Sequence, residues 1–146
     1  MNAKDKINYI SDWIKSYAVS NGFKSLVIGI SGGIDSAVTS TLSAKTGLKT
    51  IVANMPILEH KVTNDRGLSH ITWLKKNFKN VEDLKIDLSV VFENFKTALN
   101  SNNSEHGYAN SQARIRMTTL YQIAASNKGI VVGTGNKVED FGIGFY

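Results

Sequence analysis

A short apolar segment that runs directly into a glycine turn is the feature that most constrains the fold of this chain. Residues 25–30 read Ser-Leu-Val-Ile-Gly-Ile, a continuous apolar run typical of a parallel strand that is buried on both faces. The run stops at the Ser-Gly-Gly sequence of residues 31–33, and a helical stretch then extends from Asp35 to about Ala44. The pattern predicts a strand, a tight turn and a helix in direct succession.

The rest of the chain alternates in the same way between helical and strand-like segments. Further helices are expected over residues 3–20, 65–78, 90–99 and 110–126, and further strands over residues 49–54, 84–88 and 130–134. This alternation is typical of an α/β fold, in which a doubly wound parallel sheet carries helices on both faces and the crossovers are right-handed. A length of 146 residues suits a single domain that covers residues 1–146.

Three segments fall at the ligand-binding edge of such a sheet. Doubly wound sheets bind ligands outside the carboxyl ends of their strands. The turn at residues 31–36, the strand exit at 54–56 and residues 133–136 all lie at the carboxyl ends of predicted strands. We therefore expect these three segments to build one ligand site.

The glycine turn has the chemistry of a phosphate site that also holds a cation. Gly32 and Gly33 lack Cβ atoms, so their N–H groups can approach an anion, and the next helix directs its positive dipole end to the same point. Ser31 and Ser36 add hydroxyl donors. Asp35 would repel a phosphate unless a divalent cation lay between them. The alternative is a plain strand-to-helix turn in which Asp35 and Ser36 cap the helix.

Two commoner phosphate loops are excluded. A Walker A loop counted from Gly29 requires glycine at position 34, where this chain has isoleucine, and then lysine, which is absent. The dinucleotide pattern G-x-G-x-x-G also fails, because the glycines stand at 29, 32 and 33.

Composition narrows the partners and the compartment. The absence of cysteine excludes a disulfide framework and a thiolate zinc site. A net charge of +5 suits a polyanion or simply solubility, but the basic residues form neither a dense run nor an aromatic-interleaved stripe. We find no apolar stretch long enough for a leader or a membrane helix. The expected protein is cytoplasmic and binds neither nucleic acid nor membrane.

Three segments together resemble a known family. Residues 31–36 are similar to the S-G-G-x-D-S loop of ATP pyrophosphatases, which cleave ATP between its α and β phosphates. Residues 110–117, Asn-Ser-Gln-Ala-Arg-Ile-Arg-Met, match the N-x-x-A-R-x-R-M helix of ammonia-dependent NAD synthetases. Residues 133–139 match the G-T-x-x-x-x-E segment of that family, and a glycine–aromatic run follows at 142–145. The chain thus resembles the ammonia-dependent NAD synthetases, which have an adenine-nucleotide hydrolase-like fold.

The resemblance implies a role for each matching position. Arg114 would contact the dinucleotide substrate, and Asp35 and Glu139 would coordinate Mg²⁺. The residues implied in ATP binding are Gly29, Ile30, Ser31, Gly32, Gly33, Ile34, Asp35, Ser36, Asn54 and Thr134.

The resemblance also implies a reaction and its partners. Nicotinic acid adenine dinucleotide (deamido-NAD) would be adenylated on its carboxylate by ATP, and free ammonia would then displace AMP. No side chain is needed as a nucleophile, and none is assigned a catalytic role. A homodimer is expected, because family members hold the dinucleotide at a two-fold interface.

Other readings stay open. In the family the glycine–aromatic run continues into a further segment, so the single domain is expected to be truncated at its C-terminal side. One alternative is another ATP pyrophosphatase with a different acceptor. A second alternative is a truncated nucleotide-binding module without turnover.

The two arginines of the 110–126 helix are expected to differ. Arg116 lies two positions beyond Arg114 and therefore about 200° round the helix axis. The resemblance assigns Arg114 to the dinucleotide, and Arg116 is then expected to face packing or a partner.

Overall fold

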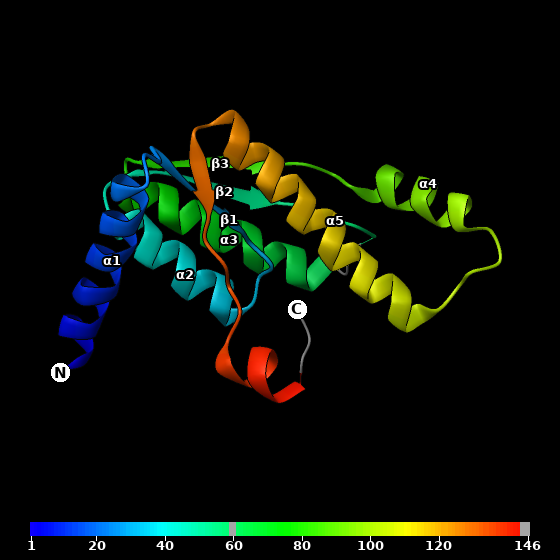
Figure 1. Cartoon of the computed structure of the whole chain (residues 1–146), viewed down its shortest axis with the longest axis horizontal. Helices are drawn as coiled ribbons and strands as arrows, with labels where there is room; N and C mark the ends of the chain where they lie inside the picture. Colours follow the sequence, from blue (N-terminus) through cyan, green and yellow to red (C-terminus); the bar gives the residue numbers. More distant parts are fainter. Residues whose placement is uncertain (59–60, 144–146) are drawn as a thin grey trace.

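The computed structural model describes residues 1–58 and 61–143, without the side chains of 61–64 and 143. The described helices are α1 (Ala3–Ser20), α2 (Ile34–Lys45), α3 (Lys61–Asn77), α4 (Ser89–Leu99), α5 (Glu105–Ser126) and the π-helical turn η1 (Glu139–Ile143). The described strands are β1 (Ser25–Gly29), β2 (Lys49–Asn54), β3 (Val81–Lys85) and β4 (Gly129–Val131). They form one parallel sheet in the order β3-β2-β1-β4 (Figure 1). The predicted doubly wound α/β fold is confirmed.

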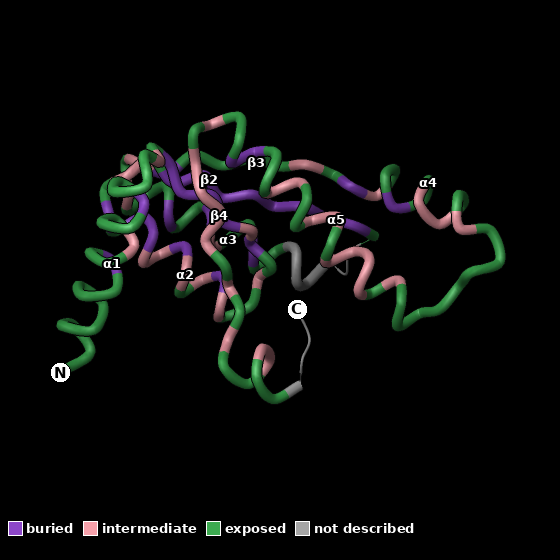
Figure 2. Tube along the Cα trace, viewed as in Figure 1, coloured by how far each residue is buried: buried purple, intermediate pink, exposed green. Residues whose placement is uncertain are grey.

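Alternate residues of the central strands feed two cores on opposite faces of the sheet. Leu26 and Ile28 of β1 belong to the core beneath α1, α2 and α3, whereas Val27 faces Ile123 and Ala124 of α5. Figure 2 shows the buried residues concentrated along the strands between these helical layers. Each buried aliphatic side chain of this size contributes roughly 1.5–3 kcal/mol to stability. This two-sided burial explains why β1 is a continuous apolar run.

The helices beneath the sheet are also joined by a polar contact. The Oγ of Ser40 on α2 lies 2.9 Å from Nε2 of His70 on α3, and the same hydroxyl donates to the Ser36 carbonyl over 2.7 Å. Burial lowers the pKa of His70. The contact ties α3 to the helix that follows the glycine turn.

Some expected boundaries are wrong. The third strand is Val81–Lys85 instead of 84–88, because β3 pairs with β2 from Val81 opposite Thr50 and lies at the sheet edge, where only Val81 is buried. An edge strand needs no apolar alternation, so the apolar positions of 84–88 were misleading. Helix α5 begins five residues before the expected start, since the Ser104 side chain caps it by accepting from Gly107 N–H. Strand β4 ends at Val131, and η1 was not expected.

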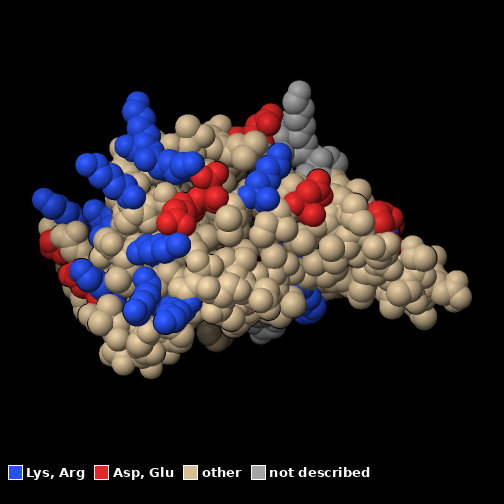
Figure 3. Space-filling model, turned by 90° about the horizontal axis from the view of Figure 1, so that it is seen from above, with Lys and Arg blue, Asp and Glu red and all other residues tan. Residues whose placement is uncertain are grey.

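Many of the lysines that give the chain its positive charge lie away from the ligand-binding edge of the sheet. Lysines precede or begin the strands at positions 24, 49, 79 and 128. Others lie in the last turns of α2 and α3, where they complement the negative end of the helix dipole. In Figure 3 the basic side chains on the visible face gather toward the end from which the strands start.

The described residues contain no helix long and apolar enough to cross a membrane.

We expect Gly129→Ala to destabilise the protein by on the order of 1–3 kcal/mol through overpacking. A Cβ atom on Gly129 would clash with Oγ of the buried Ser25 and lie 3.0 Å from the Ser25 carbonyl oxygen. The Ser25 hydroxyl cannot easily move, because it donates to Asn127 O over 3.0 Å. Urea denaturation measures the loss. Gly133→Ala is the control, since a Cβ atom there meets no described atom within 4 Å; equal stability of the two variants would contradict the prediction.

Candidate functional site

The chain leaves β1 through a turn that only glycine adopts without strain. Ile30 N–H still donates to Ala53 O over 2.9 Å, which prolongs the pairing of β1 with β2 by one residue. Gly32 then has φ +82°, in the left-handed region. The predicted succession of strand, glycine turn and helix is therefore present.

The two serines hold the turn in shape. Ser31 Oγ accepts from Gly33 N–H over 3.2 Å, and Ser36 Oγ donates to Gly33 O over 3.0 Å. The two hydroxyl oxygens lie 3.1 Å apart. Ser36 is only 2% exposed, so its hydroxyl lies inside the turn, while Ser31 is exposed. A contact between Ser36 and phosphate stays a prediction.

The start of α2 is open to an anion. Its N-cap is Gly33, which has no side chain to make the capping hydrogen bond. The alternative in which Asp35 or Ser36 caps the helix is therefore not supported. Uncapped first-turn N–H groups and the helix dipole together favour a bound anion.

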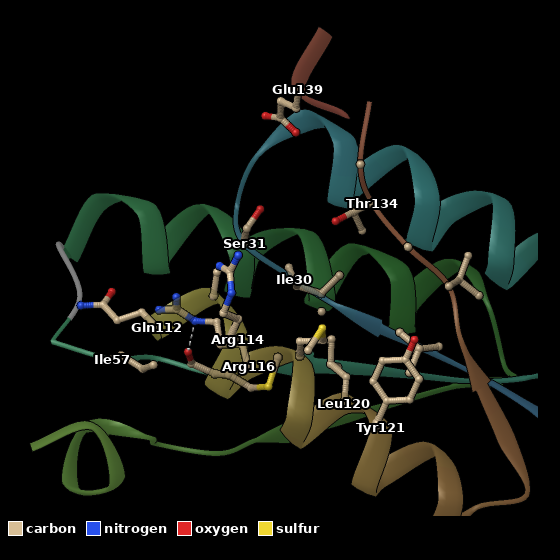
Figure 4. A pocket seen from close by; sticks show the side chains of 18 of the residues that line it. Ile30, Ser31, Ile57, Gln112, Arg114, Arg116, Leu120, Tyr121, Thr134 and Glu139 are labelled. Atoms are coloured by element: carbon tan, nitrogen blue, oxygen red, sulfur yellow. Dashed lines mark hydrogen bonds between the residues drawn. The ribbon is translucent and has the colours of Figure 1, made fainter. Parts of the chain in front are cut away.

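A cavity of about 1260 Å³ lies beside this turn, between the carboxyl ends of β1 and β4 and helix α5 (Figure 4). The sequence-predicted residues that line it are Gly29, Ile30, Ser31, Arg114, Thr134 and Glu139. The structure therefore brings together residues from the glycine turn, the Asn110–Met117 segment and the Gly133–Glu139 segment. The other predicted residues of the turn, 32–36, are not part of the lining and continue from Ser31 into α2.

Asn54 lies elsewhere. It is 3% exposed, and its side chain is close to Gly67 of α3, on the opposite face of β2 from the cavity. The next residue, Met55, lines the cavity instead. Successive strand residues point to opposite faces, so a polar residue chosen at the strand exit can face the wrong way. An ATP contact of the Asn54 side chain stays a prediction without support from this arrangement.

Sequence reasoning missed the apolar wall of the cavity. Met55 and Ile57 come from the exit of β2, and Met117, Leu120 and Tyr121 come from α5. Leu120 and Tyr121 lie three and four positions after Met117, which places the three residues on one side of the helix. This spacing was the signal available in the sequence. Apolar walls with a few convergent polar groups are typical of ligand pockets.

Both arginines of α5 line the cavity, so Arg116 belongs to the site as well as to the packing that was expected of it. The stripe of α5 that faces the cavity contains Ala113, Met117 and Leu120. At about 100° per residue, this stripe lies between Arg114 and Arg116, which therefore flank it on either side. The expected angle of about 200° between Arg114 and Arg116 is correct. The cavity, however, faces the side chains of α5 that lie between the two arginines.

The two guanidinium groups are held differently. Arg114 Nη1 donates to Asn110 O and to Asn110 Oδ1, over 3.1 Å in each case, and the residue is exposed. Arg116 is half-buried, and its Nε donates to Met55 O over 2.9 Å, which ties α5 to the exit of β2 (Figure 4). Two cationic side chains of α5 thus line the cavity together with Ser31 of the glycine turn.

The two predicted metal ligands, Asp35 and Glu139, are joined by a third residue. Asn136 Nδ2 donates to Asp35 Oδ2 over 3.2 Å, and Asn136 Oδ1 accepts from Glu139 N–H over 3.0 Å. No group of three or more metal-binding side chains occurs in the described part of the chain. Two carboxylates fit Mg²⁺ all the same, because Mg²⁺ in nucleotide sites takes its remaining ligands from phosphate and water.

The glycine–aromatic run at 142–145 lies partly outside the described residues.

Comparison with known proteins gives a consistent result. The NAD synthase family model matches residues 6–146. The NH₃-dependent NAD⁺ synthetases of Mesoplasma florum and Methanosarcina mazei are 32% and 34% identical to all of this chain. The chain spans 59% and 57% of their lengths.

Solved structures agree with these relatives. An NMN synthetase from Francisella tularensis is 31% identical and superimposes with a TM-score of 0.86, over 95% of this chain and 57% of its own. An NH₃-dependent NAD synthetase from Campylobacter jejuni is 29% identical, with a TM-score of 0.84, over 95% of this chain and 59% of its own.

Proposed function

The chain belongs to the NAD synthase family, and from this premise we propose that it supplies the ATP-binding part of an enzyme that amidates deamido-NAD to NAD. The observation that carries the proposal is the cavity itself. An uncapped helix start, two carboxylates and two arginines meet around it, beside an apolar wall. This combination suits a nucleoside triphosphate and a second anionic ligand.

The proposed reaction has two steps. The nicotinate carboxylate attacks the α phosphorus of ATP, so that a C–O–P mixed anhydride forms and pyrophosphate leaves. Ammonia then attacks the carbonyl carbon, the bond to AMP breaks, and a proton is lost as the amide forms. Both steps need aligned anions and stabilised leaving groups more than a nucleophilic side chain.

The residues of this chain would act by binding and orientation. The N–H groups at the turn and the first turn of α2 would hold the β and γ phosphates. Arg114 would hold a phosphate or carboxylate of the dinucleotide through a planar two-point contact. Asp35 and Glu139 would hold Mg²⁺, which when bound supplies positive charge between the carboxylates and the phosphates.

The remaining proposals concern the compartment and the oligomeric state of the protein. We propose a cytoplasmic homodimer, and the exposure of Met117 and Tyr121 on α5, at 50% and 61%, is consistent with a second chain that covers part of the cavity. Sedimentation velocity at roughly tens of micromolar is expected to show a dimer, since apolar interfaces of this kind assemble by mass action. A monomer at that concentration would argue against it.

One assay separates the candidate functions. The protein is incubated with ATP, Mg²⁺, ammonium and deamido-NAD, and AMP, pyrophosphate and NAD are measured. Equal amounts of all three products are expected. AMP and pyrophosphate without NAD would indicate a different acceptor, and ATP binding without AMP would indicate a module without turnover. Because the Francisella tularensis relative is an NMN synthetase, the acid form of NMN is tested beside deamido-NAD.

A further inference from the structure

Asn136 uses its whole side-chain amide to connect two parts of the site that are far apart in the sequence. Its Nδ2 group donates to Asp35 Oδ2 across a separation of 101 residues. Its Oδ1 accepts from the N–H groups of Val138 and Glu139, over 3.0 Å in both cases. The Asn136 carbonyl also accepts from Asp140 N–H over 2.9 Å. Asn136 is thus the point where α2 is joined to the helical turn that carries Glu139.

These contacts reach the Asp35 carboxylate directly and Glu139 through its backbone N–H. The amide hydrogen holds one oxygen of Asp35, so the second oxygen, Oδ1, can take a cation. The oxygen of the same amide holds the Glu139 N–H and thereby places the Cα atom from which the Glu139 side chain extends. Capping of this kind is a familiar use of asparagine, but a cap needs only the oxygen. The nitrogen directed at Asp35 goes beyond what the local turn requires.

Only an amide meets both demands at this position. Aspartate would keep the acceptor for the two N–H groups, but it would lose the donor and place a second negative charge beside Asp35. Serine would keep an acceptor, but its side chain is too short to make these contacts. Asn136 is half-buried, so solvent cannot fully replace either contact.

We propose that Asn136 is a positioning residue, which sets the separation of the Asp35 and Glu139 carboxylates for a divalent cation that arrives with a nucleoside triphosphate. The inference rests on the proposed function. Asn136 acts through Asp35 and Glu139 and does not itself contact the reacting atoms. Partners of this kind typically contribute about 10–100-fold to metal affinity.

The test compares ATP affinity with Mg²⁺ and with a chelator, measured by calorimetry on the 146-residue protein. In Asn136→Ala, which removes both amide contacts without adding a charge, the affinity in chelator should change little, whereas the gain caused by Mg²⁺ should fall by about 10–100-fold. The ratio of the two affinities is the decisive readout, because general damage to the fold would weaken both. Lys137→Gln, at an exposed position of the same turn, should keep the wild-type ratio.

A double-mutant cycle separates positioning from an independent effect. If Asn136 works through Asp35, the losses in Asn136→Ala and Asp35→Asn should not add in the double variant. Should Asn136→Ala lose its cooperative unfolding transition, Asn136→Gln replaces it, since the longer side chain keeps both groups but misplaces them. The same fall in the Mg²⁺ gain is expected. A wild-type ratio in the folded variant would overturn the inference alone. Wild-type protein without any Mg²⁺ gain would overturn the proposed function as well.

Discussion

Asp35→Ala is expected to remove the Mg²⁺-dependent part of ATP affinity. The loss should exceed ~100-fold, because removing a direct metal ligand costs more affinity than removing an outer-shell partner. The half-buried carboxylate lies in the first turn of α2, beside N–H groups suited to phosphate. Such a charge is tolerated next to a triphosphate only when a cation lies between them. Without the carboxylate, ATP would bind equally with and without Mg²⁺.

Calorimetric titration of ATP, with Mg²⁺ and with a chelator, measures this effect. Asp12→Ala is the matched control, because Asp12 is an exposed acid on α1. The fold should survive in both variants, as shown by an unchanged urea midpoint. If Asp35→Ala retains the Mg²⁺ dependence of the wild type, the carboxylate does not hold the cation.

The second large effect concerns Arg114. Arg114→Ala is expected to weaken deamido-NAD binding by roughly 10-fold or more, the value of a hydrogen bond to a charged group. Arg114→Lys should weaken it severalfold, because an ammonium cannot reproduce the two-point contact of a guanidinium. ATP binding should stay near that of the wild type, since the turn and α2 hold the phosphates.

Arg116 provides the comparison. Its guanidinium lines the same cavity, but its Nε is already held by Met55 O. Arg116→Lys should therefore affect deamido-NAD binding much less than Arg114→Lys. Calorimetry on both lysine variants tests the assignment. Equal losses, or an Arg114 effect confined to ATP, would show that the dinucleotide contact is made elsewhere.

Features decided by neighbouring residues could be predicted from the sequence. The apolar run of β1 and the turn with its left-handed Gly32 depend on side-chain burial and backbone sterics over a few positions. The alternation of helices and strands likewise indicated the parallel sheet and the edge at which sheets of this kind bind ligands. Those inferences did not require knowledge of which distant segments meet.

Contacts between distant segments were decided only in the tertiary structure. The sequence contains no local signal that Asn136 meets Asp35, that β3 pairs from Val81, or that Met55 instead of Asn54 faces the cavity. Each depends on strand register or on how α5 lies across the sheet, and both are set by packing that involves the whole chain. A helix angle can be calculated from the sequence, but the direction in which the cavity lies cannot. For that reason the glycine turn could be assigned from its residues alone, whereas the roles of Arg116 and Asn136 required the fold.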